Sequence, residues 1–218
     1  MNMKLYGYWR SSATYRVRIA LNLKQLEYDY IPVHLVNNGG EQRSEEYKRL
    51  NPAMLVPSFV DEERDLTLNQ SLAIIEYLDE MYPDPNRLLP EHKSDRARVR
   101  MAAFDIACDI QPVSNLRVLN TLKGELGAND AQVTQWCRNI ITNGFVALEQ
   151  RLQTRSGKYA FGYALSLADV CLVPQVYNAM RFGVEMQKFP IIQKIYDNCQ
   201  ALDAFIAAAP EKQIDAVK

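Results

Sequence analysis

The sequence predicts an α+β protein of two domains, in which a small N-terminal α/β domain is followed by a domain built only of helices. Strand-like and helical segments alternate up to residue 82, as the pattern of apolar residues indicates. The segment Pro83-Asp84-Pro85-Asn86-Arg87 follows, and its prolines cannot continue a helix. Beyond this break the pattern is helical. We therefore expect domains at residues 1–82 and 92–218, joined by a linker at 83–91.

The first domain is predicted to follow the element order βαβαββα. Short runs rich in β-branched and aromatic residues mark its strands, and apolar residues that recur at helical spacing mark its helices. The predicted strands cover residues 4–8, 27–33, 56–60 and 66–68. Three helices are predicted. The first follows Ser12, the second ends near Leu50 and the third covers residues 70–82. This order is that of a thioredoxin-like domain.

Long helical patterns fill the second domain. They cover residues 96–122, 130–152, 167–180 and 191–209, with breaks near 124–129, 157–166 and 182–190. Neither an internal repeat nor a low-complexity tract interrupts them. The separation of a mixed domain from an all-helical one is therefore the main organising feature of the chain.

Composition argues against several classes of protein. The net charge is −1 and the 25 Lys and Arg residues are scattered, so the basic surface of a nucleic-acid-binding protein is missing. The N-terminus lacks the apolar run of a signal peptide, and no apolar stretch approaches the roughly 20 residues of a membrane span. We therefore expect a cytoplasmic protein with neither a membrane nor a nucleic acid as partner.

Metal binding is not indicated. The cysteines lie far apart, unlike the ligands of zinc sites or the members of redox pairs, and we expect them to be reduced and structural. They are Cys108, Cys137, Cys171 and Cys199. His34 and His92 are isolated, so we interpret both as surface or packing residues.

The first candidate site is the segment Arg10-Ser11-Ser12-Ala13-Thr14, where a predicted strand ends and a helix begins. Free backbone N–H groups and the positive end of the helix dipole converge there and favour an anion. A thiol with a pKa of about 8.5 is only about 3% ionised at pH 7, and lowering its pKa by about two units needs about 2.7 kcal/mol. A serine hydroxyl and a helix end together suffice for that. The alternative is that Ser11 and Ser12 only cap the helix.

Two further segments suit other parts of a thiol-containing peptide. Val56-Pro57 opens a strand, and a cis bond there would turn the Val56 N–H and C=O outward for pairing, with a trans proline as the alternative. Gln70-Ser71 opens a helix whose N-terminus suits a carboxylate, with a plain cap as the alternative. The three sites together match the thiol, the backbone and the γ-glutamyl carboxylate of glutathione.

Several motifs carry a resemblance to a known family. They are Tyr8-Trp9-Arg10-Ser11-Ser12, Arg16-Val17-Arg18-Ile19-Ala20-Leu21, Asn51-Pro52, Val56-Pro57 and residues 70–78, followed by residues 88–90, 109–112, 144–149 and 168–176. Together they resemble the zeta-class glutathione transferases over almost the whole chain. The resemblance implies the two-domain glutathione transferase fold, glutathione as cofactor and a homodimer.

The resemblance also implies which residues contact glutathione. Ser11 would activate the thiol, with Tyr8 as the alternative donor. The implied contacts are Ser11, Ser12, Ala13, Thr14, Tyr15, Arg16, Gln42, Val56, Gln70 and Ser71 in the first domain, and Gln111, Asn115, Leu116 and Arg117 in the second. The chain departs from the family pattern at Ala13, which stands where Ser-Ser-Cys has its cysteine. Chemistry that needs this cysteine is therefore absent.

The implied reaction is the cis–trans isomerisation of maleylacetoacetate to fumarylacetoacetate, a step of tyrosine and phenylalanine catabolism. The alternatives are isomerisation of maleylpyruvate, conjugation of glutathione to electrophiles such as α-halo acids, and a non-catalytic binding module. Both keto acids carry carboxylates, which the planar fork of arginine binds well. Catalytic roles fall to Ser11, Ser12 and Arg10, and substrate binding to Arg10, Arg117 and Arg181.

Asp169 has two interpretations. Ser166-Leu167-Ala168-Asp169 has the spacing of a capping box, with Asp in place of the usual Glu or Gln. A carboxylate in a cleft is the catalytic alternative. We expect the structural role, because the resembling family uses this segment as a buried helix cap.

Overall fold

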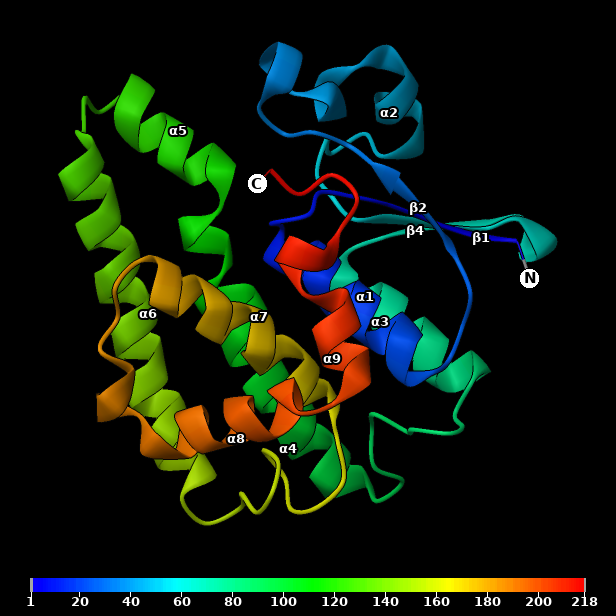
Figure 1. The fold of residues 1–218 in the computed structure, drawn as a ribbon, viewed down its shortest axis with the longest axis vertical. Helices are drawn as coiled ribbons and strands as arrows, with labels where there is room; N and C mark the ends of the chain where they lie inside the picture. Colours follow the sequence, from blue (N-terminus) through cyan, green and yellow to red (C-terminus); the bar gives the residue numbers. More distant parts are fainter. Residues whose placement is uncertain (1, 218) are drawn as a thin grey trace. The chain divides into compact units, whose positions relative to one another are not determined.

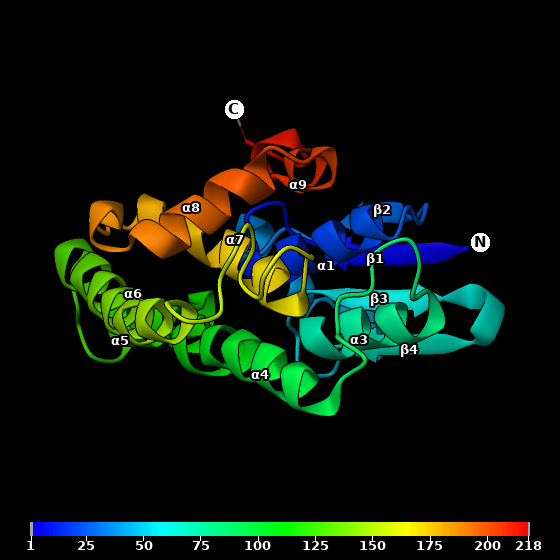
Figure 2. The same ribbon diagram turned by 90° about the horizontal axis from the view of Figure 1, so that it is seen from below.

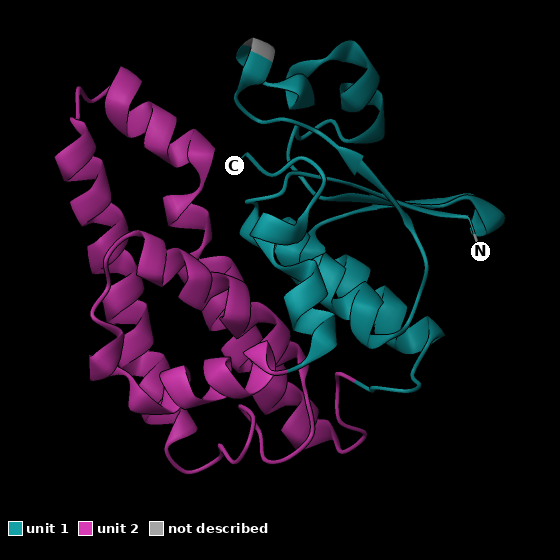
Figure 3. Cartoon of the chain, viewed as in Figure 1, with its two compact units in different colours: residues 1–87, 202–218 teal, residues 88–201 magenta. Residues whose placement is uncertain are grey.

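A computed structural model of the chain describes residues 2–217, apart from the side chain of Asn38. The chain divides into two compact units, coloured separately in Figure 3. Residues 1–87 and 202–218 form unit 1, and residues 88–201 form unit 2. The first unit boundary, between residues 87 and 88, falls within the predicted linker at 83–91, whereas residues 202–218 group with the N-terminal unit and not with the second domain, where the sequence pattern placed them.

Unit 1 contains a mixed sheet. Its strands are β1 (Met3–Gly7), β2 (Asp29–Pro32), β3 (Ser58–Asp61) and β4 (Leu66–Asn69), in the order β2-β1-β3-β4. Strand β1 pairs parallel with β2 and antiparallel with β3, and β3 pairs antiparallel with β4. Leu5 of β1 lies opposite Phe59 of β3, and both side chains are fully buried. The two central strands therefore carry the core.

Helices cover both faces of this sheet. Helices α1 (Ser12–Leu23) and α3 (Ser71–Met81) pack against each other and lie below the sheet in Figure 1, whereas α2 (Glu45–Leu50) lies above it. Their buried residues include Val17 with Leu21 and Ile75 with Leu78, at the helical spacing that the sequence predicts, whereas Met81 at the end of α3 is exposed. The predicted order βαβαββα and the thioredoxin-like fold are confirmed.

The C-terminal segment completes unit 1. Helix α9 (Asp203–Ala208) packs on α1, where Arg18 Nε donates to the Ala208 carbonyl oxygen at 2.9 Å. Asn22 Nδ2 likewise donates to the Ala204 carbonyl oxygen at 2.9 Å. Helical periodicity does not show which surface a helix covers, and for this reason the sequence pattern placed the segment in the second domain.

Helices make up unit 2, as predicted. They are α4 (Lys93–Phe104), a π-helical segment (Asp105–Ile110), a 3-10 turn (Pro112–Ser114), α5 (Leu116–Gly124), α6 (Asp130–Leu152), α7 (Leu167–Arg181), a second 3-10 turn (Met186–Lys188) and α8 (Pro190–Gln200). Helix α7 is the core of the unit, because residues 167–176 are all buried and Figure 2 shows it between α4 and α8. No helix within residues 2–217 combines the length and the apolar character needed to cross a bilayer.

Two predicted helices are interrupted in the structure. The prediction of one helix over residues 96–122 is wrong, because α4 and α5 are separated by the π-helical segment and the turn. Pro112 has no N–H to continue the helix, and the Asn115 side chain starts α5 by accepting from the Val118 N–H at 3.2 Å. The predicted helix over residues 191–209 is likewise two helices, α8 and α9.

Candidate active site

Ser11 occupies the turn between β1 and α1. Its N–H donates to the Tyr8 carbonyl oxygen at 2.9 Å, and its Oγ accepts from the Thr14 N–H at 3.2 Å. The second bond uses a lone pair of Oγ and leaves the hydroxyl proton able to donate elsewhere. Ser11 is half-exposed, so it is a helix cap and an accessible hydroxyl donor at the same time.

The candidate residues at the start of α1 differ in solvent exposure. Ser11 and Ala13 are half-exposed. The other candidates are buried, with exposed fractions of 7% for Ser12, 0% for Thr14, 2% for Tyr15 and 2% for Arg16. Ser11 is therefore the more accessible hydroxyl of the serine pair, and Ala13 shares its solvent-accessible side of the first turn.

The start of α3 combines an unusual backbone with a buried cation. Gln70 has φ +75°, in the left-handed region that non-glycine residues rarely adopt. Ser71 is buried, and its Oγ accepts from Arg16 Nη1 at 3.3 Å. Arg16 thus brings a positive charge from α1 to the N-terminus of α3. A strained residue and a buried cation at one helix end favour an anion-binding role.

The segment before β3 presents an unpaired backbone edge. The Val56-Pro57 peptide bond is cis, and Val56 is half-exposed. Within residues 2–217, neither the Val56 N–H nor its C=O makes a backbone hydrogen bond. The backbone of Val56 is therefore available for an extended peptide ligand.

A buried polar network, which the sequence did not reveal, supports this edge. Tyr47 Oη donates to the Leu55 carbonyl oxygen at 2.7 Å and lies 2.9 Å from Ser58 Oγ, which donates to Asn69 Oδ1 at 2.7 Å. Asn51 Nδ2 also donates to the Leu55 carbonyl oxygen, at 2.7 Å. Burial raises the pKa of Tyr47 to about 12, so its phenol stays a neutral donor at physiological pH. The network links the segment before β3 to the strand end that precedes Gln70.

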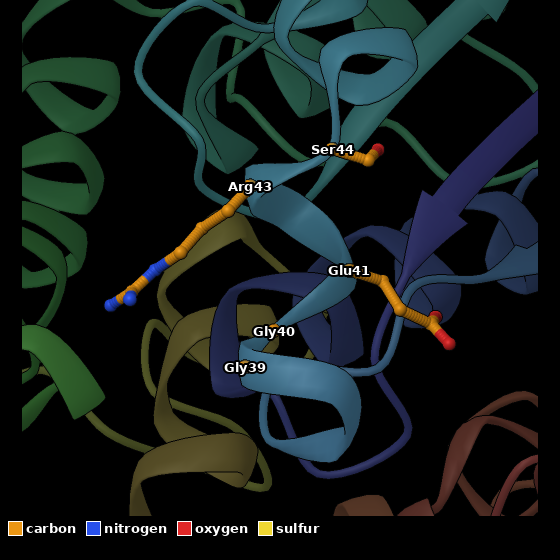
Figure 4. Close-up of a pocket in the computed structure, with 5 residues that line it drawn as sticks. All are labelled: Gly39, Gly40, Glu41, Arg43 and Ser44. Carbon is orange, nitrogen blue, oxygen red and sulfur yellow. The ribbon is translucent and has the colours of Figure 1, made fainter.

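Gln42 lies in the segment that leads to α2. Its side chain is buried, and its Oε1 has no hydrogen-bond partner within the described residues. A Cβ at Gly40, which has φ +100°, would lie 2.6 Å from Gln42 Nε2, so only glycine fits there. The neighbouring residues Gly39, Gly40, Glu41, Arg43 and Ser44 line a hollow of about 500 Å³, and the side chains of Glu41 and Arg43 point to opposite sides (Figure 4). The Gln42 oxygen is a buried acceptor without an internal partner, which an ordered water or a ligand donor would satisfy.

His34 orders the same segment. Its Nδ1 accepts from the N–H groups of Val36 and Asn37 at 3.2 and 2.8 Å, and its ring lies edge-on to Tyr8 with the centroids 5.0 Å apart. The Glu41 carboxylate accepts from the His34 N–H at 2.6 Å. His34 is thus a packing residue, as one of its two interpretations predicted, and it also holds the loop that carries Gln42.

Three helix N-termini in the described chain differ from the rest. The first turns of α2, α4, α6, α7 and α9 contain Asp or Glu. The start of α8 receives the Glu149 carboxylate, which accepts from the N–H groups of Ile191 and Ile192 at 2.7 and 3.0 Å. The first turns of α1, α3 and α5 contain no acidic residue. These three carry candidate residues, and their first turns offer no carboxylate that competes with an anionic ligand.

The candidate residues of unit 2 gather at one turn. Gln111 donates its N–H to the Ile106 carbonyl oxygen at 2.9 Å at the end of the π-helical segment. Asn115 caps α5, and Leu116 and Arg117 form its first turn. The structure therefore groups four predicted contacts around the start of α5.

The three candidate arginines are all exposed, which suits a role in binding a soluble acid. The guanidinium of Arg10 lies 5.2 Å from the centre of the Trp9 ring in unit 1. In unit 2, Arg117 belongs to the start of α5, whereas Arg181 ends α7 with its guanidinium 4.5 Å from the Phe182 ring.

Asp169 has the structural role expected of it. Its side chain is fully buried, and its carboxylate accepts from the Ser166 N–H at 2.9 Å, from Ser166 Oγ at 2.7 Å and from the Ala160 N–H at 2.7 Å. Burial raises its pKa to about 6, against the opposing effect of these hydrogen bonds. The capping box at the start of α7 is confirmed.

Comparison with known proteins identifies the family of the chain. The family model for the glutathione S-transferase N-terminal domain matches residues 1–80. The probable maleylacetoacetate isomerase of Vibrio cholerae serotype O1 is 55% identical over 216 residues, which are 99% of each chain. A solved maleyl pyruvate isomerase, a bacterial zeta-class glutathione transferase, has a TM-score of 0.93 at 44% identity, over 98% of this chain and 100% of that one.

The similarity covers both units of the chain. A maleylacetoacetate isomerase from Methylobacterium extorquens AM1, solved with malonate and glutathione bound, has a TM-score of 0.93 at 36% identity over 99% of this chain and 100% of that one. The resemblance in sequence motifs and the observed fold agree with these matches. The chain therefore belongs to the zeta-class glutathione transferases, the family of the maleylacetoacetate isomerases.

Proposed function

We propose that this chain converts maleylacetoacetate to fumarylacetoacetate with glutathione as its thiol cofactor. The observation that carries the proposal is the start of α1, where the accessible Ser11 hydroxyl stands at a helix N-terminus with no acidic residue in its first turn. Such an environment favours a thiolate over a thiol. The relatives named as maleylacetoacetate isomerases support the choice of substrate.

The residues present fit the parts of glutathione. Ser11 and the N-terminus of α1 suit the thiolate. The unpaired backbone of Val56 and the unpartnered Gln42 Oε1 suit the peptide part, which carries N–H donors and C=O acceptors. Ser71, with the Arg16 guanidinium bonded to it, suits the γ-glutamyl carboxylate at the start of α3.

The remaining predicted contacts are proposed on the family resemblance. In unit 1, Ser12, Ala13, Thr14 and Tyr15 form the first turns of α1 around these groups, and Gln70 sets the backbone before Ser71. In unit 2 they are Gln111, Asn115, Leu116 and Arg117 at the start of α5.

When bound, glutathione supplies a thiolate that adds to the cis double bond, so that rotation and elimination yield the trans product. The chain must keep this thiol ionised, which needs about 2.7 kcal/mol for a shift of about two pKa units. A hydrogen bond from Ser11 to a charged sulfur contributes about 1.5 to 3 kcal/mol, and a helix N-terminus about 0.3 to 1 kcal/mol. Their combined contribution of about 1.8 to 4 kcal/mol includes the required value, so we propose that this reaction does not depend on a cysteine in place of Ala13.

The exposed arginines are proposed to bind the substrate carboxylates. Arg181→Met should lower kcat/KM for the keto acid roughly 10- to 150-fold, because a hydrogen bond to a charged group is lost. Conjugation of a neutral electrophile at the same thiol serves as the control and should change little. Equal, small losses on both substrates would remove Arg181 from the site and leave Arg10 and Arg117 to bind the acid.

One assay tests the function directly. Maleylacetoacetate and maleylpyruvate are each supplied with and without glutathione, and formation of the fumaryl products is followed. We expect turnover of maleylacetoacetate only with glutathione. Faster turnover of maleylpyruvate would favour the second candidate, which the similarity to a solved maleyl pyruvate isomerase supports. Conjugation of α-halo acids without isomerisation would instead identify a transferase.

We also propose that the chain is a homodimer and works in the cytoplasm in tyrosine and phenylalanine catabolism. The family resemblance supports the dimer, and the proposed substrate supports the pathway. Sedimentation at micromolar concentration should show the mass of two chains. A monomer under these conditions would contradict the dimer without affecting the proposed reaction.

A further inference from the structure

A residue far along the chain forms a hydrogen bond with the turn that carries Arg10 and Ser11. Trp9 is itself part of this turn, next to Arg10, and lies outside both β1 and α1. Its N–H donates to Asp215 Oδ2 at 2.9 Å, and its carbonyl oxygen accepts from Arg18 Nη2 at 2.9 Å. Both backbone polar groups of Trp9 are therefore bonded to side chains rather than to a strand or a helix partner.

The C-terminal segment provides the first of these side chains and contacts the second. Asp215 follows α9 and the 3-10 turn at Pro210–Lys212, and its Oδ2 also accepts from Tyr30 Oη at 3.4 Å. Arg18 is fully buried, and its Nε donates to the Ala208 carbonyl oxygen at the end of α9 at 2.9 Å. Residues 208–215 therefore reach the two backbone groups of Trp9, one through Asp215 and the other through Arg18.

Charge explains why an acid suits this position. Burial of Arg18 favours its neutral form and lowers its pKa, and the neighbouring tyrosines, Tyr30 foremost, together with the negative charge of Asp215 oppose that effect. Tyr15 and Tyr30 present ring faces to the same guanidinium, at 5.3 and 5.8 Å from their centroids. Asp215 thus offsets a buried cation and accepts the Trp9 N–H in one place.

We propose that Asp215 is a positioning residue of the active site, which acts through Trp9 to hold the turn from which Arg10 and Ser11 project. Trp9 is the common element, because the Arg10 guanidinium lies over its ring and the Ser11 N–H bonds back to Tyr8, its neighbour in sequence. The C-terminal segment is then part of the catalytic scaffold. The role of Ser11 in this inference rests on the proposed function, whereas the hydrogen bonds of Asp215 and Arg18 with the Trp9 backbone do not.

The test compares three variants in the ligand-free protein and in turnover. Asp215→Ala removes the acceptor, Asp215→Asn keeps an amide oxygen that can accept the Trp9 N–H, and Ile214→Ala changes a neighbour that is 80% exposed and serves as the control. Amide hydrogen exchange of Trp9 is measured against that of α3, together with thermal unfolding. Glutathione affinity, the thiol pKa of bound glutathione and kcat/KM for isomerisation complete the set.

We expect Asp215→Ala to speed exchange at Trp9 at least about tenfold, since a hydrogen bond that protects the amide is lost, while exchange in α3 stays unchanged. The bound thiol should lose part of its ionisation and kcat/KM should fall about tenfold, with Asp215→Asn recovering most of the exchange protection. Unchanged exchange at Trp9, or an equal acceleration in α3, would overturn the proposal. If the unmodified protein lacked isomerase activity, the proposed function would fail, yet the exchange data would still decide the role of Asp215.

Discussion

Helices α1 and α7 both have a serine as N-cap residue, but their N-termini have different roles. At α1 the Ser11 side chain caps the helix, is half-exposed and has no acidic residue in the following turn. At α7 the Ser166 cap is buried, and Asp169 in the first turn accepts from its N–H and its hydroxyl. A helix end that the protein satisfies with its own carboxylate is structural, whereas one left without a carboxylate is open to a ligand.

The third residue of each helix accounts for the difference between the two N-termini. Thr14 of α1 and Asp169 of α7 both follow their caps by three residues, and both are fully buried. The carboxylate of Asp169 is turned back onto its own cap and onto the Ala160 N–H, at 2.7 Å. Thr14 brings no charge to its helix end. The comparison predicts that substitutions at α7 change stability and substitutions at α1 change thiol chemistry.

The largest effect is expected from Asp169→Ala. The variant leaves the buried N–H groups of Ala160 and Ser166 without an acceptor, and each such loss costs about 1 to 3 kcal/mol. We expect the free energy of unfolding in denaturant to fall by about 3 to 5 kcal/mol. The kcat of the molecules that remain folded should stay the same. A variant that is stable but inactive would show that the carboxylate is catalytic after all.

The pH dependence of the same carboxylate gives a second test. Its pKa of about 6 in the folded protein lies above the value of about 3.9 expected after unfolding, so the folded state binds the proton more tightly. Its contribution to stability is therefore complete below about pH 4 and is lost as the pH rises through about 6. Over that interval, the stability of the unmodified protein relative to Asp169→Asn should fall by about 3 kcal/mol. Denaturant unfolding from pH 4 to 7 measures it, and a difference independent of pH would contradict the assigned burial effect.

Ser11→Ala should act on the thiol rather than on the fold. Loss of a hydrogen bond to a thiolate should raise the thiol pKa of bound glutathione and lower kcat/KM roughly 10- to 150-fold, whereas loss of the cap costs only about 1 kcal/mol of stability. Absorbance titration of bound glutathione gives the pKa. Ser12→Ala, at a buried position, is the matched control with a smaller expected effect on the thiol. An unchanged pKa in Ser11→Ala would move the donor role to Ser12 or Tyr8.

The smallest effect is expected from placing an acidic residue in the first turn of α1, where α7 has Asp169. Ala13→Asp places a carboxylate in the first turn of α1 at a half-exposed position. It should stabilise the helix by about 0.3 to 1 kcal/mol and destabilise a nearby thiolate by a similar amount, which lowers the ratio of thiolate to thiol about two- to fivefold. Ala13→Asn is the uncharged control. Equal thiol pKa values in the two variants would show that charge at this helix end does not govern the thiol.

Local patterns in the sequence predicted most of unit 1. Alternating and helical periodicities of apolar residues indicated the order βαβαββα, because burial of one face repeats along each element. The Ser166-to-Asp169 spacing also indicated the cap of α7, since a capping box is complete within four residues. The interruption at Pro112 and Asn115 was missed, although a proline followed by a capping residue is a usable signal for a new helix.

Two features of the site depend on contacts between distant residues, and only the tertiary structure decided them. The network of Tyr47, Ser58 and Asn69 forms because adjacent strands bring Ser58 opposite Asn69, a pairing that no local pattern encodes. The placement of Asp215 on Trp9 depends on the return of the C-terminal segment to unit 1. The sequence by itself determined the helix start that suits a thiolate, because caps and first-turn charges are set within one helical turn. Tertiary structure decided which distant groups hold that start in place, since those contacts follow from packing rather than from spacing along the chain.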